Sequence, residues 1–100
     1  MHINKLKVML SIMLEVNRGK APKIKNYPLS DSEVYDIIQL CQDELLIKGF
    51  YVKRKTSGDV ELVDIHSMRV TLKGLEFLNK YSELLKSYKS GKELKEWLQY

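Results

Sequence analysis

Three consecutive cations, Lys53, Arg54 and Lys55, are the residues of this chain whose type and spacing best suit a chemical task. They fall in a predicted strand, where side chains alternate, so Lys53 and Lys55 share one face and Arg54 points to the other. Cations near a hairpin tip can contact phosphates, and an arginine can enter the minor groove of DNA. The alternative is an edge strand whose charges prevent aggregation, and the sequence does not separate the two readings.

Lysines near the N-terminus extend this basic character. Lys20, Lys23 and Lys25 lie in a segment that also holds two prolines, and we expect Lys23 and Lys25 to contact phosphate from a second side. About six such contacts support only weak, salt-sensitive binding, roughly 10⁻⁴ to 10⁻⁶ M for a nonspecific complex.

Residues suited to catalysis or metal binding are scarce. His2 and His66 have no partner at a spacing typical of a site, and one cysteine with two distant histidines cannot supply the roughly four ligands that zinc needs. Cys41 falls on an apolar helical stripe, where a packed thiol is expected rather than a nucleophile. We therefore expect no enzyme, no cofactor, no metal site and no small-molecule substrate.

Composition and charge limit the class of protein. One hundred residues with an apolar fraction of 44% make a single domain, residues 1–100, that can bury a core. Residues 1–28 carry six cations and one acid (+5), whereas residues 29–50 carry one cation and five acids (−4). The single cysteine and the lack of a signal sequence or an apolar run of about 20 residues predict a cytoplasmic protein without a membrane partner.

Sequence patterns predict the elements that position these residues. Apolar spacing favours a helix over 3–18 that buries one face, followed by at most a single turn over 20–28. A capping box at Ser30–Glu33 starts a helix that runs to about Lys48 and is ended by Gly49. Strands are predicted at 50–55 and 60–65, with a bulge or bend at 63–65. Thr71 caps a helix that continues to about Lys86, and a second capping-box spacing at Ser90–Glu93 precedes a short last helix.

This order of elements predicts an α+β fold, a winged helix-turn-helix. It has a three-helix core, a two-stranded β wing at about 50–66 and a C-terminal helical extension at about 87–100. Four segments carry a resemblance to a known family: LSDSEVY (29–35), KGFY (48–51), VTLKGLEFL (70–78) and KELKEWL (92–98). Through them the chain resembles the YjcQ-like family of small winged-helix proteins from Gram-positive bacteria and their phages. The resemblance implies a DNA-binding regulator or accessory factor with double-stranded DNA as its partner.

Under this implied function, the capped helix would enter a DNA groove with Ser32, Tyr35 and Gln39 outward. The same face carries Asp36 and Asp43, whose carboxylates phosphate groups repel, so a solvated acidic face is the favoured reading of those two residues. A protein-interaction module is the alternative function, in which the acidic helix 30–48 docks a basic partner and Tyr35 acts as the anchor.

The helix after Thr71 carries two apolar stripes, and only one of them can face the core. The second stripe comprises Phe77, Tyr81, Leu84 and Tyr88. Trp97, with Leu94 and Leu98 on the last helix, can cover it within the monomer, which is the reading we favour. A second subunit is the alternative, in which case this stripe and Trp97 form a homodimer interface.

Overall fold

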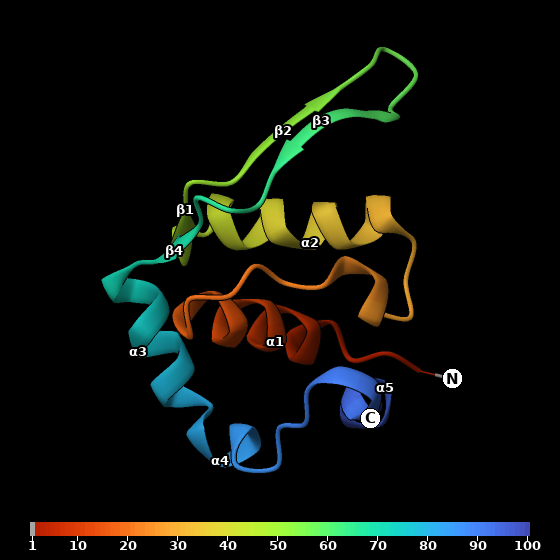
Figure 1. Cartoon of the computed structure of the whole chain (residues 1–100). Helices are drawn as coiled ribbons and strands as arrows, with labels where there is room; N and C mark the ends of the chain where they lie inside the picture. Colours follow the sequence, from red (N-terminus) through yellow and green to blue (C-terminus); the bar gives the residue numbers. More distant parts are fainter. Residues whose placement is uncertain (1) are drawn as a thin grey trace.

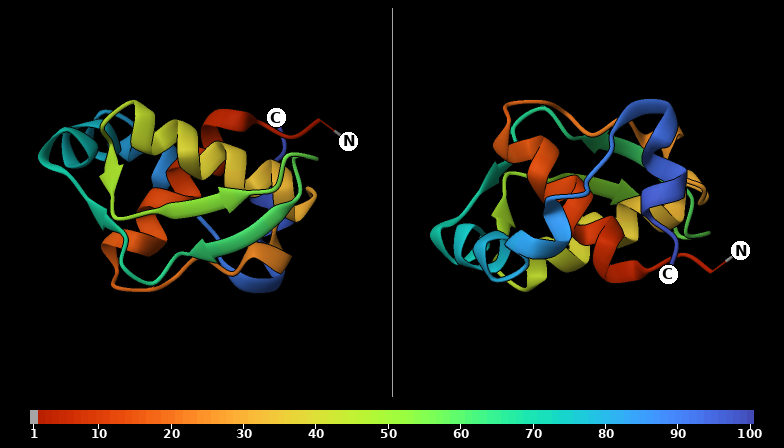
Figure 2. Two further views of the ribbon diagram at one scale, coloured as in Figure 1. Left: turned by 90° about the horizontal axis from the view of Figure 1, so that it is seen from above. Right: turned by 90° about the horizontal axis from the view of Figure 1, so that it is seen from below.

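The computed structural model describes residues 2–100. Its helices and its hairpin are stacked in layers (Figure 1). A long hairpin lies over helix α2 (Asp31–Asp43), and α2 lies over helix α1 (Lys5–Asn17). The C-terminal helices cover α1 from the opposite side, as the views from above and below show (Figure 2). The protein is therefore an α+β fold, the class that the sequence predicted.

Helix α1 is the centre of the core. Asn4 caps it by accepting a hydrogen bond from the Lys7 amide, and Gly19 follows its end with a left-handed φ of 78°. Six of its residues are buried, and they point in all directions from the helix axis: Val8, Leu10, Ser11, Ile12, Met13 and Val16. The prediction of a single buried face was wrong, because layers pack on both sides of this helix. One 3₁₀ turn, η1 (Ile24–Asn26), follows in the proline-containing segment, as predicted.

Helix α2 begins as predicted and ends early. Both hydrogen bonds of the capping box between Ser30 and Glu33 are formed. The helix stops at Asp43, not Lys48, because the Leu46 amide bonds to the Cys41 carbonyl and the Leu45 amide to the Gln42 carbonyl. This is the Schellman arrangement, with Leu45 at φ 63° in the place that glycine usually takes. The predicted stop at Gly49 was therefore wrong.

The hairpin contains four short strands in two antiparallel pairs. β1 (Ile47–Lys48) pairs with β4 (Arg69–Val70), and β2 (Tyr51–Arg54) pairs with β3 (Val60–Asp64). The strands predicted at 50–55 and 60–65 are confirmed, but the register shift lies between Lys53 and Arg54, near the tip, and not at 63–65. Gly49 separates the two pairs with a φ of 86°, and a Cβ there would overlap the Ser67 carbonyl oxygen.

The C-terminal third turns back across α1. Thr71 caps α3 (Leu72–Lys80) by accepting from the Gly74 amide, as predicted, but the helix breaks at Tyr81. A separate helix α4 (Ser82–Leu85) follows, so the prediction of one continuous helix to about Lys86 was wrong. Ser90 caps nothing with its side chain, because Gly91 takes a left-handed φ of 66° and starts the 3₁₀ turn η2 (Gly91–Glu93). α5 (Leu94–Trp97) then ends the chain beside its beginning, where the Asn4 amide bonds to the Leu98 carbonyl.

The second apolar stripe is covered within the chain. Phe77, Tyr81, Leu84 and Tyr88 are half-buried and pack against the core. Trp97 is buried, meets the Tyr88 ring edge-on at 4.8 Å between centroids, and donates its indole N–H to the Ser87 hydroxyl. Trp97 thus covers Tyr88 within the chain, whereas the other three residues of the stripe pack against the core without a direct contact to Trp97 among those described for residues 2–100. The homodimer stays a prediction.

Candidate nucleic-acid interface

The β2–β3 ribbon has an inner face toward α2 and an outer face toward solvent. Val52 pairs with Val63 on the inner face, and both pack against the core. Lys53 pairs with Leu62 on the outer face, where both are exposed. Lys55 is exposed beyond the end of β2. Alternation along the strand thus separates Arg54 from its two lysine neighbours, as the sequence predicted.

Arg54 is turned inward and bonded to α2. Its guanidinium donates to the Asp36 carboxylate at 2.7 Å, to the Ser32 hydroxyl at 3.0 Å and to the Gly58 carbonyl at 2.9 Å. Two residues expected on the DNA-contacting surface, Arg54 and Ser32, are therefore bonded to each other. The predicted repulsion between Asp36 and a nucleic acid is also reduced, because a cation of the chain itself neutralises this carboxylate.

The remaining outward residues of α2 also contact the protein itself. The Tyr35 ring stacks against Phe50 at 6.5 Å, and the Gln39 amide donates to Asp43 at 2.8 Å. Gln42 donates to the Phe50 carbonyl and accepts from the Phe50 amide, at 2.9 and 2.8 Å. The hairpin lies across this face of the helix (Figure 1). A groove-reading role for α2 would require these contacts to break.

The predicted lysines of the second side do not join the hairpin surface. Lys25 pairs with Asp31 at 2.7 Å, and the hydrogen bond and charge of that carboxylate raise the pKa of Lys25. Lys23 lines a separate hollow together with Glu15, Tyr27 and Tyr88. The eight residues predicted to bind DNA are thus distributed over at least three environments.

A pair of cations that the sequence analysis missed lies at the base of the hairpin. The pairing of β1 with β4 places Lys48 directly opposite Arg69, and both side chains are exposed. Like charges at directly opposed positions of an antiparallel pair repel each other. Neither side chain makes an ion pair with another residue of the described range 2–100. A bound anion would relieve this repulsion.

A basic hollow of about 460 Å³ adjoins this pair, between the end of α1 and the segment that leads into β4. Its polar lining residues are Asn17, Lys20, His66 and Arg69, and none of its lining residues is acidic. The nearest acid in the loop sequence, Asp64, accepts bonds from the His66 amide at 2.8 Å and from the Ser67 hydroxyl at 3.3 Å. The hollow therefore presents donors suited to a phosphate group.

Charge is divided between the two layers. Residues 47–70 carry five cations and three acids, which gives +2, whereas α2 (Asp31–Asp43) carries four acids and no cation, which gives −4. The three acids of the hairpin each have a partner within the hairpin: Glu61 lies 3.7 Å from Lys53, Asp59 accepts from the Ser57 hydroxyl, and Asp64 accepts from the His66 amide. A polyanion would approach from the hairpin side, away from α2.

The described residues lack a metal-binding cluster and a membrane-spanning helix. Within residues 2–100, no three His, Cys, Asp or Glu side chains are gathered where they could hold a metal ion. No helix of that range has the length and apolar character needed to cross a bilayer.

Comparison with known proteins gives one match. The model of a family described as YjcQ protein matches residues 11–97. This range includes α1 from its second turn, the whole hairpin and the C-terminal segment as far as Trp97. No curated protein and no solved structure matches the chain.

Proposed function

The chain belongs to the YjcQ family, and we propose that it is a non-enzymatic winged-helix protein that binds the phosphate backbone of double-stranded DNA. The element order supports the winged-helix assignment: α1, the single turn η1, α2, a hairpin and α3. In this assignment η1 takes the place of the first helix of the helix-turn-helix, and the hairpin is the wing.

The observation that carries the proposal is the unpaired cation pair at the base of the hairpin. Lys48 and Arg69 are exposed, directly opposed and lack an acidic partner among residues 2–100. Lys53 and Lys55 continue the exposed positive charge toward the tip. A duplex presents phosphates at regular intervals, so it can satisfy cations spaced along a ribbon.

The contacts of α2 argue for backbone binding without sequence readout. The polar side chains that would read bases are bonded to the hairpin or to one another. The helix itself carries four acids and no cation, and this negative charge disfavours phosphate. We therefore assign the protein to accessory or architectural work on DNA in a bacterial or phage setting, rather than to recognition of one operator.

Salt-dependent binding tests this proposal. A labelled duplex of random sequence should bind at about 50 mM salt with a dissociation constant of roughly 10⁻⁴ to 10⁻⁶ M, and four phosphate contacts predict a log–log salt slope of about −3.6. Fluorescence anisotropy measures both quantities. The double variant Lys48→Gln/Arg69→Gln should weaken binding and make the slope shallower by about 1.8.

A matched control removes the same charge elsewhere. Lys86→Gln/Lys89→Gln also lowers the net charge by two, but on the C-terminal segment, where these lysines pair with Glu83 and Glu93. This variant should keep nearly the parent slope, because only long-range attraction is reduced. Equal losses in the two double variants would show that net charge, and not the hairpin surface, drives binding. No binding of the parent at 1 mM protein would end the proposal.

The alternative of a protein-interaction module has weaker support. Its proposed anchor, Tyr35, is half-buried against Phe50 and is not a free aromatic side chain. Docking on the acidic helix would have to rely on peripheral acids alone, which contribute little to affinity.

A further inference from the structure

A chain of four side chains crosses the layer between α1 and the C-terminal segment. Ser11 is fully buried in the middle of α1, and its hydroxyl lies 2.8 Å from the Tyr27 hydroxyl and 2.9 Å from that of Tyr88. The Tyr88 hydroxyl donates to Glu15 Oε1 at 3.0 Å. Each hydroxyl has one proton, so Ser11 must donate to Tyr88 and Tyr27 must donate to Ser11. The donors are thus ordered toward the Glu15 carboxylate.

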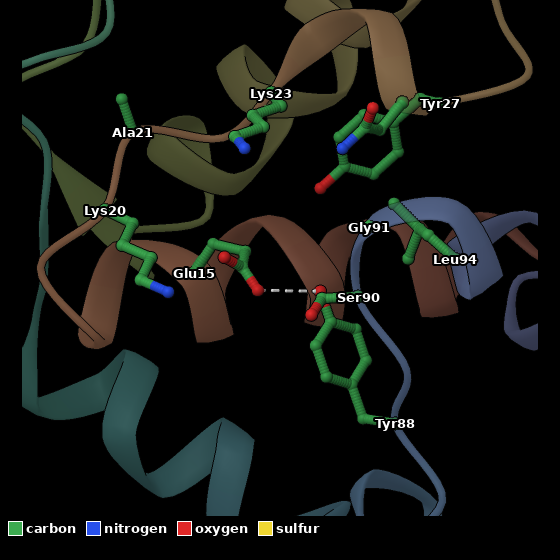
Figure 3. Close-up of a pocket in the computed structure, with 10 residues that line it drawn as sticks. Glu15, Lys20, Ala21, Lys23, Tyr27, Tyr88, Ser90, Gly91 and Leu94 are labelled. Atoms are coloured by element: carbon green, nitrogen blue, oxygen red, sulfur yellow. Dashed lines mark hydrogen bonds between the residues drawn. The ribbon is translucent and has the colours of Figure 1, made fainter.

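This chain forms one side of a hollow of about 480 Å³. In Figure 3 Lys20 lies to the left of Glu15 and Lys23 above it, while Tyr27 and Tyr88 lie to the right. Three separate segments build its walls: α1, the loop of residues 20–27 and the stretch from Tyr88 to Leu94. The volume is in the range of pockets that hold small molecules.

Only one of the two carboxylate oxygens of Glu15 has a partner among the described residues. Its Oε1 accepts from Tyr88 and lies 3.8 Å from the Arg18 guanidinium, whereas no hydrogen bond or ion pair of the described residues reaches Oε2. The tyrosine bond fixes the orientation of the carboxylate. Glu15 can therefore accept a donor from a ligand through Oε2 without rearrangement.

The charges that line the hollow are two lysines and one glutamate, so they sum to +1. Neither Lys20 nor Lys23 makes an ion pair within residues 2–100. The two lysine ammonium groups suit an anion, and the free carboxylate oxygen suits an ammonium. A ligand with a phosphate at one end and an amine at the other matches these charges.

We propose that the hollow between Glu15, Lys23 and Tyr88 binds a small phosphorylated amine. The phosphate contacts Lys20 and Lys23, and the amine contacts Glu15 Oε2. This site is separate from the DNA surface of the hairpin, although Lys20 also lines the hollow at the hairpin base. The test therefore uses Lys23 and Glu15 and leaves Lys20 unchanged.

Calorimetry with three matched probes tests the pairing of charges. O-phosphoethanolamine carries both groups, ethyl phosphate lacks the amine, and ethanolamine lacks the phosphate. The complete probe should bind about tenfold more tightly than ethyl phosphate, which corresponds to one charge-assisted hydrogen bond. Ethanolamine should show no binding at 10 mM, on the order of the weakest affinity that calorimetry resolves.

Two variants test which residue contacts each end of the ligand. Glu15→Gln keeps an oxygen that accepts from Tyr88 but removes the charge, so it should reduce the preference for the amine-bearing probe to about twofold or less. Lys23→Gln should weaken both phosphate probes about fivefold or more. Lys86→Gln is the control, since that lysine lies outside the hollow and pairs with Glu83.

Three results would overturn the proposal. The first is no binding of O-phosphoethanolamine at 10 mM, on the order of a very weak fragment affinity. The second is an equal affinity of the parent for ethyl phosphate and O-phosphoethanolamine. The third is competition between the probe and duplex DNA, with Lys23→Gln weakening both, since the hollow would then be a backbone contact. Because Lys48→Gln/Arg69→Gln should leave probe binding intact, failure of the DNA proposal and failure of the ligand proposal are distinguishable.

Discussion

The contact between Gln42 and Phe50 gives the sharpest test of how the hairpin is held on α2. Phe50 is 6% exposed, and its backbone N–H and C=O both bond to the Gln42 side chain. Gln42→Ala would leave two backbone groups without partners in a nearly closed site. A buried unpaired group costs about 1–3 kcal/mol, and water entering the vacated space lowers this, so we expect a loss of about 2–4 kcal/mol in the free energy of unfolding.

Urea denaturation followed by circular dichroism measures this loss, and thermal unfolding should show a midpoint roughly 10–30 °C lower. Hydrogen exchange at the Phe50 amide should also accelerate, because the bond that protects it is gone. Gln39→Ala is the matched control: it makes the same change in the same helix but removes only an exposed bond to Asp43, worth about 0.5 kcal/mol or less.

Losses of unfolding free energy that agree to within about 0.5 kcal/mol in the two glutamine variants would contradict a special role for the Gln42 bonds. Gln42→Glu separates the two bonds. The glutamate still accepts from the Phe50 amide but presents a second oxygen to the Phe50 carbonyl, so it should also destabilise the fold while keeping the side-chain size.

Three further outcomes are expected. Gly74→Ala should cost at least about 2 kcal/mol, because the added methyl group would overlap the Leu46 carbonyl oxygen and come within 2.6 Å of a Val70 methyl; urea denaturation checks this. Cys41 is fully buried, and burial raises the pKa of its thiol to about 12. Iodoacetamide at pH 8 should therefore alkylate the folded protein at least about 100-fold more slowly than the urea-unfolded chain. Comparable rates would contradict the burial of this thiol. Burial also raises the pKa of the Tyr88 hydroxyl from 10.0 to about 12. The stability that this shift contributes is present below pH 10 and is lost between pH 10 and 12. The variant Tyr88→Phe should therefore show a smaller fall in unfolding free energy over that range.

Features that depend on neighbouring residues were predictable from the chain. The Ser30–Glu33 capping box, the Thr71 cap and the cap at Gly19 each rest on contacts within about four residues. The hairpin at 50–65 was predictable for the same reason, because its alternation and its turn residues are local signals. Alternation also separated Arg54 correctly from Lys53 and Lys55.

Predictions from the sequence failed where contacts between residues far apart in the chain decide the local structure. Helix α2 ends in a motif that uses Leu45 where glycine would be the visible signal, and Ile47 leaves the helix to pair with Val70, which lies 23 positions later. The C-terminal capping spacing at Ser90 was present but unused, because the chain turns through Gly91 to reach α1. Short patterns of this kind are compatible with several structures, and packing selects one.

The candidate sites show the same division. From the order of its residues alone, the protein is determined to be an α+β domain with a basic hairpin beside an acidic helix, since helix caps and strand alternation act over a few residues. Only the tertiary structure decides that the hairpin covers α2, which engages Arg54 with Asp36 and leaves Lys48 opposite Arg69. It likewise gathers Glu15, Lys23 and Tyr88 into one hollow. These placements depend on which surfaces are buried together, and hydrophobic burial is non-directional, so no spacing in the sequence encodes them.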